Sequence, residues 1–160
     1  MPRIAITGHM NLTADSVPLI YHAITGALAL YAADDLTGIS CLARGADSVF
    51  AQAVLDLGGK LEVLLPCAGY RDQKVKRDHA PQFDELTRRA TTVRVMPFEE
   101  ANRVAYEATN EVLVSTCDTL FAVWDGQSGV DKGSTWSVVE YARSRGLPVE
   151  VIWPQGASRD

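Results

Sequence analysis

Residues 3–12 read RIAITGHMNL, a short apolar strand that turns at Gly8 into a small polar loop. The pattern returns at 38–47, GISCLARGAD, where another apolar run leads into a loop around Gly45. A segment with helical spacing follows each of these loops. Strand, glycine-containing loop and helix, in this order, are typical of an α/β protein with a parallel sheet.

Apolar runs of this kind recur along the whole chain. The expected strands are 3–7, 38–42, 61–65, 92–96, 120–124 and 149–153. Several are continuously apolar, which favours strands that are covered on both faces. The expected helices between them are 19–33, 47–57, 81–90, 101–112 and 134–145. This alternation predicts a Rossmann-like, doubly wound α/β fold, with a mainly parallel six-stranded sheet and helices on both faces.

Length and composition limit the class of protein. With 160 residues, 47% of them hydrophobic and 22% charged, the chain is expected to form a single domain over 1–160. A formal charge of −5 argues against broad nucleic-acid binding, duplex included, because such binding needs clustered cations. No signal-peptide pattern and no run of about 18 apolar residues is present, so we expect a cytoplasmic protein without a membrane span.

The cysteines and histidines give no sign of a metal or cofactor. Cys41, Cys67 and Cys117 lack C-x-x-C spacing, and no cluster of His, Asp and Glu has the spacing of metal ligands. We therefore expect no metal and no cofactor. Cysteines at the edges of apolar runs are typical of small buried side chains in a reduced protein.

One segment interrupts the compact pattern. Residues 66–82 are polar, carry six Asp, Lys and Arg side chains and follow an expected strand. A long segment at this place is interpreted as a mobile surface loop or as a lid over a site. Tyr70 within it is a candidate for stacking on a base.

Three loops follow the carboxyl ends of expected strands: 8–12, 43–47 and 125–135. In an open α/β sheet, ligands bind beyond these ends, near the point where the strand order reverses. Each loop leads to a helix N-terminus, whose free N–H groups and positive dipole end suit a phosphate. The candidate ligand-binding residues are Gly8, His9, Asn11, Arg44, Gly45, Asp47, Tyr70, Asp125, Gly126, Gly133, Ser134 and Thr135.

For each of these loops a ligand-binding and a structural interpretation stay open. At 133–135, GST could wrap an anionic group, or Ser134 could simply cap the helix; the loop is not a Walker A motif. Arg44 could clamp a phosphate while Asp47 accepts ribose hydroxyls, or the two could form a structural ion pair with Asp47 as an N-cap. His9 could act as an acid or base, or could hold the turn by hydrogen bonds.

The chain resembles the SLOG superfamily, the Rossmann-like group that includes the Lonely Guy phosphoribohydrolases and the SMF/DprA proteins. The resemblance covers nearly the whole chain and is strongest with small bacterial branches. It implies a nucleotide or nucleotide-derived ligand along the carboxyl edge of the sheet. It also implies a homodimer, for which the helix at 19–33 could supply a face, although this helix could equally belong to the core. The motifs that carry it are ITGHMNL (6–12), GISCLARGAD (38–47), CDTLFAVWDG (117–126) and GST (133–135).

The chain departs from the Lonely Guy pattern P-G-G-x-G-T-x-x-E. Val138 stands where that pattern has its catalytic Glu, and Glu140 follows two residues later, about 200° further around a helix. The family's catalytic Arg would fall at Thr109 or Asn110. The resemblance therefore implies a retained binding frame without the known hydrolytic pair.

Two functions from different classes follow. The first is a nucleotide-binding module or sensor. The alternative is a nucleoside-monophosphate phosphoribohydrolase in which Asp47, Asp125 or Glu140 activates water. A structural subunit with a vestigial pocket is the third, and it would respond to no ligand.

Overall fold

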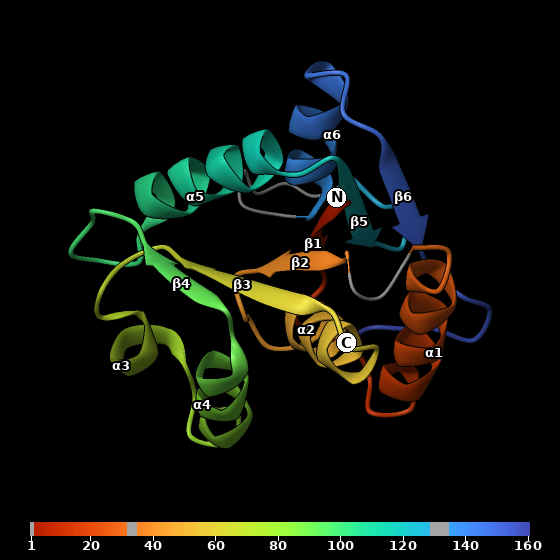
Figure 1. Ribbon diagram of the computed structural model, residues 1–160, viewed down its shortest axis with the longest axis horizontal. Coiled ribbons are helices and arrows are strands. Elements are labelled where there is room, and N and C mark those ends of the chain that lie inside the picture. Colours follow the sequence, from red (N-terminus) through yellow and green to blue (C-terminus); the bar gives the residue numbers. More distant parts are fainter. Residues whose placement is uncertain (1, 32–34, 129–134) are drawn as a thin grey trace.

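A computed structural model describes residues 2–31, 35–128 and 135–160 (Figure 1). Within these ranges six strands form one sheet with the order β4-β3-β2-β1-β5-β6, and every neighbouring pair is parallel. The predicted fold class is confirmed, with a sheet that is parallel throughout. The strands are β1 (Arg3–Gly8), β2 (Thr37–Ser40), β3 (Lys60–Leu65), β4 (Thr92–Val95), β5 (Thr119–Val123) and β6 (Val149–Ile152).

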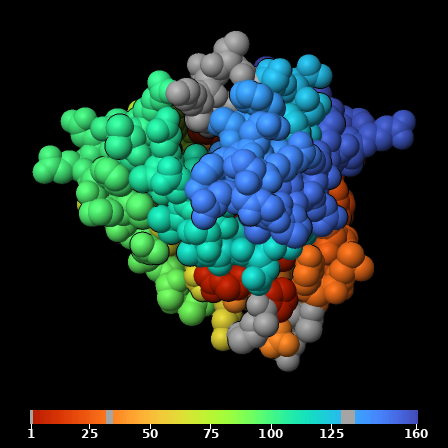
Figure 2. Space-filling view, turned by 90° about the horizontal axis from the view of Figure 1, so that it is seen from above, coloured from red at the N-terminus to blue at the C-terminus, as the bar shows by residue number. Residues whose placement is uncertain are grey.

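Helices cover both faces of the sheet. Helices α1, α2, α3 and α4 lie on one side and α5 and α6 on the other (Figure 1). Seen from above, α5 and α6 lie side by side across their face (Figure 2). The helices are α1 (Ser16–Leu28), α2 (Ala46–Asp56), α3 (Tyr70–Lys74), α4 (Ala80–Arg89), α5 (Arg103–Thr116) and α6 (Thr135–Ser144).

The alternation of side chains along β1 explains why both faces are apolar. Ile4 and Ile6 point to the α1–α2 side, where they share a buried cluster with Phe50. Ala5 points to the other side and packs with Leu113 of α5. Successive side chains of a strand alternate between faces, so a strand buried on both must be apolar throughout.

The strand order reverses at β1. From β1 the chain moves outward through β2, β3 and β4, and then returns to place β5 on the other side of β1. The loops that leave β1 and β5 therefore diverge to opposite faces and open a crevice at their carboxyl ends, the usual ligand position in such sheets.

Two glycines allow α2 to begin against the end of β1. A Cβ on Gly8 would lie 2.5 Å from the Cβ of Ala46 and 2.8 Å from that of Val123. Gly45 has a φ of +83°, and a Cβ there would lie 2.6 Å from the carbonyl oxygen of His9. That same oxygen accepts a hydrogen bond from the backbone N–H of Ala46 at 3.2 Å.

The segment 66–82, interpreted as a mobile surface loop or a lid, is not an irregular loop throughout, because it contains α3 and the start of α4. Tyr70 anchors it, because its ring is buried and packs 6.1 Å from that of Phe83. The helix expected at 19–33 runs from Ser16 to Leu28, and positions 32–34 lie outside the described residues. Its buried stripe of Ile20, Ile24 and Leu28 belongs to the core.

No helix in the described part of the chain is long and apolar enough to cross a membrane.

The close approach at Gly8 gives a stability test. We expect Gly8→Ala to lower the free energy of unfolding by on the order of 3 kcal/mol, because the new methyl group overlaps two neighbours that cannot move independently. Gly26→Ala is the matched control: it is exposed within α1 and meets nothing within 4 Å, so it should stabilise by about 0.5–1 kcal/mol. Urea denaturation of both variants measures the difference, and equal effects would contradict the packing described.

Candidate functional site

Two adjoining cavities lie at the carboxyl edge of the sheet. The inner one, of about 130 Å³, is bordered by the ends of β1 and β2 and by α5 and α6. The outer one, of about 340 Å³, lies between the loop after β1 and the segment 70–79. Met10 and Tyr70 line both cavities, so the two lie next to each other.

Asp47 is the most unusual group in the inner cavity. It lies in the first turn of α2 and is only 9% exposed. Its carboxylate accepts one long hydrogen bond, from the backbone N–H of Ala43 at 3.4 Å. Among the described residues it has no ion-pair partner, and burial raises its pKa to about 7. A buried carboxyl without a partner is costly to ionise, so both protonation states are populated near neutral pH.

Buried hydroxyl groups surround the same space. Thr7, Tyr70 and Thr135 line the inner cavity, and each is less than a tenth exposed. None of these three side chains has a hydrogen-bond partner within residues 2–31, 35–128 or 135–160. Buried polar groups in native proteins are normally paired, and an unpaired set around one cavity indicates a polar occupant, water or ligand.

The outer cavity has a cationic lining. Arg44 comes from the loop after β2, and Lys74 and Lys76 come from α3 and the segment after it. Arg44 forms an ion pair with Asp78, so the alternative in which Asp47 is its partner is wrong. Both members of the pair are substantially exposed.

Hydrogen bonds with the buried side chains of Ser40 and His79 fix the loop that carries Arg44 and Asp47. Leu42, fully buried, adopts a left-handed conformation with a φ of +56°. The Oγ of Ser40 accepts a hydrogen bond from the backbone N–H of Leu42 at 3.1 Å and donates one to the carbonyl of Asp47 at 3.0 Å. The buried ring of His79 lies with Nε2 3.2 Å from the carbonyl oxygen of Leu42. A non-glycine residue in this region persists only where its surroundings enforce it, which fits a loop shaped for a site.

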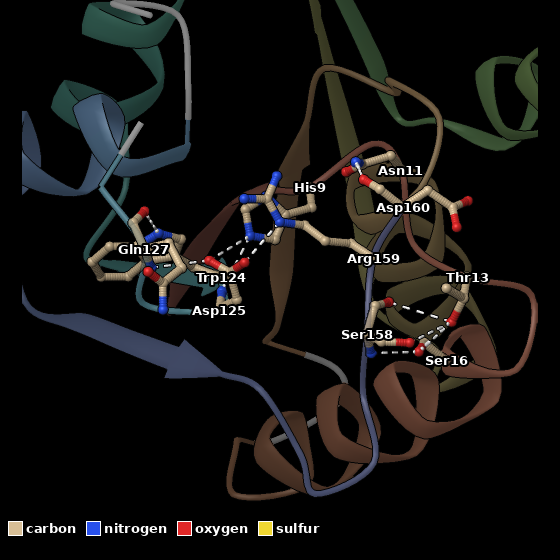
Figure 3. A network of polar contacts seen from close by, with 10 residues as sticks. All are labelled: His9, Asn11, Thr13, Ser16, Trp124, Asp125, Gln127, Ser158, Arg159 and Asp160. Atoms are coloured by element: carbon tan, nitrogen blue, oxygen red, sulfur yellow. Dashed lines mark hydrogen bonds and ion pairs between the residues drawn. The ribbon is translucent and has the colours of Figure 1, made fainter. Parts of the chain in front are cut away.

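His9 and Asp125 join the ends of β1 and β5 (Figure 3). The Nε2 atom of His9 accepts a hydrogen bond from the backbone N–H of Asp125 at 3.1 Å. Burial lowers the pKa of His9, and the positive charge of Arg159 lowers it further. The neutral ring of His9 thus links the two loops as a hydrogen-bond acceptor. This agrees with the alternative in which His9 holds the turn by hydrogen bonds.

The Asp125 carboxylate is already occupied. It accepts hydrogen bonds from the Nε of Arg159 at 2.7 Å and from the backbone N–H of Gln127 at 3.0 Å. Burial favours its neutral form, but the Gln127 and Arg159 contacts outweigh that effect and lower its pKa below the ordinary value. Asp125 does not line the inner cavity.

The last residues of the chain form a strap that the sequence patterns did not reveal. Residues 158–160 cross the loop after β1, with an antiparallel bridge between Leu12 and Arg159 (Figure 3). The side-chain amide of Asn11 donates to the backbone carbonyl of Asp160, and the N–H of Asp160 donates to the carbonyl of Asn11 at 2.9 Å. Asn11 therefore makes contacts within the fold, while its side chain still borders the outer cavity.

The remaining candidate residues lie in different places, and not all of them border the inner cavity. Glu140 lies on the exposed face of α6, 4.0 Å from Arg143, and does not line the inner cavity, because its helical position turns it away from Thr135 and Val138. Tyr70 is buried instead of standing in a lid. Gly126 has a φ of +84° in open space. Gly133 and Ser134 lie outside the described residues.

The positions that the resemblance assigned to the hydrolytic pair do reach the site. Val138, Thr109 and Asn110 all line the inner cavity. None of them can ionise in the physiological range. Of the three acidic candidates, Asp47 is the one that borders the inner cavity.

No group of three His, Cys, Asp or Glu side chains within the described ranges is placed to hold a metal ion. The thiol of Cys41 does border the inner cavity, and burial raises its pKa. It is therefore a protonated, neutral part of the lining.

Several solved structures share this fold. DprA from Streptococcus pneumoniae is 19% identical with a TM-score of 0.70, over 98% of this chain and 52% of that one. DprA from Helicobacter pylori, described with its single-stranded DNA binding mode, is 17% identical with a TM-score of 0.70, over 99% and 68%. The molybdenum cofactor binding protein from Rippkaea orientalis is 18% identical with a TM-score of 0.59, over 94% and 75%.

The chain thus shares the Rossmann-like fold of these DprA and molybdenum cofactor binding proteins, as its alternating strands and helices predicted. It spans about half the length of the S. pneumoniae DprA chain. No family model matches the sequence, and a search of curated proteins gives no match.

The state of Asp47 gives a prediction for stability against pH. Its folded pKa of about 7 exceeds the ordinary value of 3.8, so the folded protein binds more protons than the unfolded chain between about pH 4 and pH 7. Ionisation then costs stability as the pH rises through this window. Asp47→Asn removes this cost, so its free energy of unfolding relative to wild type should rise by on the order of 4 kcal/mol between pH 4 and pH 8, because each of the roughly three pKa units is worth about 1.4 kcal/mol.

Urea denaturation of both proteins across this pH range measures the difference. Glu140→Gln, at an exposed position, is the control and should follow wild type at every pH. A constant offset between Asp47→Asn and wild type would contradict the burial of an unpaired carboxyl.

Proposed function

We propose that this protein binds a nucleotide or nucleotide-derived small molecule at the carboxyl edge of its sheet, as a sensor or binding module. The observation that carries the proposal is a set of buried polar groups around the inner cavity. The hydroxyls of Thr7, Tyr70 and Thr135 have no hydrogen-bond partner among the described residues, and the Asp47 carboxylate has only the long bond from Ala43 there. Leaving such groups without partners costs free energy, which a ligand with matching donors and acceptors would recover.

The position of the cavity supports the proposal. It borders the end of β1, where the strand order reverses, and this is the ligand position of doubly wound sheets. The cationic outer cavity adjoins it, and a nucleotide needs both a polar neutral pocket and a place for its phosphate. Single-stranded DNA and the molybdenum cofactor, the ligands of two proteins with this fold, are compatible with such a use.

Binding without hydrolysis is favoured over a phosphoribohydrolase. The places of the known hydrolytic pair line the cavity but hold Val138 and the uncharged pair Thr109 and Asn110. One observation keeps the hydrolase as a second candidate: Asp47, with a pKa of about 7, is suited to general acid–base catalysis near neutral pH.

We also propose, as the sequence predicts, that the protein is a single domain over 1–160, that it is cytoplasmic and that it forms a homodimer. The exposed Val17 and Leu19 of α1 are the apolar side chains of that helix available to a partner.

Ligand-detected proton NMR with a pool of nucleoside monophosphates and ADP-ribose tests the binding function. We expect saturation transfer to at least one compound. Asp47→Asn should weaken the binding of that compound tenfold or more, because the substitution removes a buried carboxylate that accepts hydrogen bonds strongly. Glu140→Gln should bind like wild type. Absence of transfer to every compound would reject nucleotide binding and favour a vestigial pocket.

The same samples, followed over hours, test the hydrolase. Growth of free-base and ribose 5-phosphate signals would establish turnover, and Asp47→Asn should then abolish it. Turnover that persists in this variant would remove Asp47 from the mechanism. Ligand binding with no new signals over the same period is the expected result.

A further inference from the structure

We infer that the ligand is a pentose 5-phosphate unit bound in one orientation, with its sugar in the inner cavity against Asp47 and its phosphate in the outer cavity at Arg44, where Asp78 takes the phosphate's place in the free protein. The inference rests on the proposed function and adds to it the orientation of the ligand and the residue that competes with it. Neither follows from the resemblance, which implied a nucleotide-derived ligand along the carboxyl edge of the sheet without an orientation.

The side chains that line the inner cavity favour a sugar over an anion. Within the described residues no Lys, Arg or His lines it, and the Asp47 carboxyl would repel a phosphate. A carboxylate paired with a ribose diol is the usual arrangement in dinucleotide-binding folds. The volume of about 130 Å³ is close to the roughly 150 Å³ of an engineered cavity that holds benzene, so it accommodates one ring.

The outer cavity supplies the opposite charge. Arg44, Lys74 and Lys76 line it, against a single acidic residue, Asp160. Arginine binds phosphate through its forked donors, and two lysines add point charges. Met10 and Tyr70 border both cavities, so a sugar phosphate that reaches past these two side chains would have its sugar in the inner cavity and its phosphate in the outer one.

Asp78 contacts the guanidinium that this phosphate would need. The Arg44–Asp78 pair is exposed, with 42% of the Arg44 side chain and 72% of the Asp78 side chain accessible. Such pairs contribute little, because water screens them and two long side chains must be held in place. A phosphate dianion that also meets two lysines can therefore displace Asp78 at small cost.

A third hollow offers space for a base. It lies between α5 and α6, has a volume of about 220 Å³, and shares Asn110 and Val138 with the inner cavity. A sugar against Asp47 could thus extend toward it. The pentose 5-phosphate could accordingly belong to a free sugar phosphate or to a nucleotide, and affinity separates these sources.

Isothermal titration calorimetry with ribose 5-phosphate, ribose and inorganic phosphate tests the orientation. We expect wild type to bind ribose 5-phosphate at least tenfold more tightly than ribose, with an affinity that falls as salt is added. Arg44→Gln should remove this difference and leave ribose binding unchanged. Asp78→Asn should strengthen ribose 5-phosphate binding threefold or more. A cytidine or adenosine monophosphate that binds more tightly still would identify the source as a nucleotide, and equal affinity a sugar phosphate.

Asp84→Asn is the matched control. Asp84 also pairs with an arginine of this region, Arg71, at 2.7 Å, but neither residue lines the inner or the outer cavity. It should leave every affinity unchanged. An Asp78→Asn variant that binds no better than Asp84→Asn would overturn the role of Asp78.

Failure of this inference can be told from failure of the proposed function. If nucleotides bind and depend on Asp47 but are indifferent to Arg44→Gln, the orientation is wrong and the binding function stands. If neither ribose 5-phosphate nor any nucleotide binds to wild type, both are rejected. Circular dichroism of each variant confirms that a loss of binding does not come from unfolding.

Discussion

The N-terminus of α2 lies directly against the end of β1, and the site depends on this close approach. Gly8 and Gly45 permit it, since a side chain at either position would overlap atoms less than 3 Å away. The approach carries Asp47 into a place where solvent is excluded and no cation is within reach among the described residues. The packing of the fold thus creates a polar cavity in which the hydroxyls of Thr7, Tyr70 and Thr135 have no hydrogen-bond partner among the described residues.

Two charge environments meet across Tyr70. On one side the inner cavity is neutral or acidic, and on the other the outer cavity is cationic. A ligand with a neutral polar part and an anionic part fits this division in one direction only. The places where the Lonely Guy pattern has its ionisable pair hold Val138 and Thr109 or Asn110, so Asp47 is the ionisable group of the described residues that borders this cavity beside Cys41 and the tyrosines.

Much of the fold could be predicted because it depends on local patterns. Apolar runs that end in glycine-containing loops located the strands, and the sheet then had to bring these loops to one edge. The ion pair of Arg44 with Asp78 and the strap at Arg159 could not be predicted, since each joins residues 34 apart or more through the tertiary structure. The position of Glu140 followed from helical periodicity, which turned it away as expected.

The most direct test is the titration of the Asp47 side-chain carboxyl, followed by carbon-13 NMR in the free protein and with a bound nucleoside monophosphate. The account predicts a midpoint of about 7 in the free protein, and a displaced midpoint once the ligand occupies the inner cavity. A midpoint near the ordinary 3.8 that does not respond to ligand would show that Asp47 is solvated and lies outside the binding site.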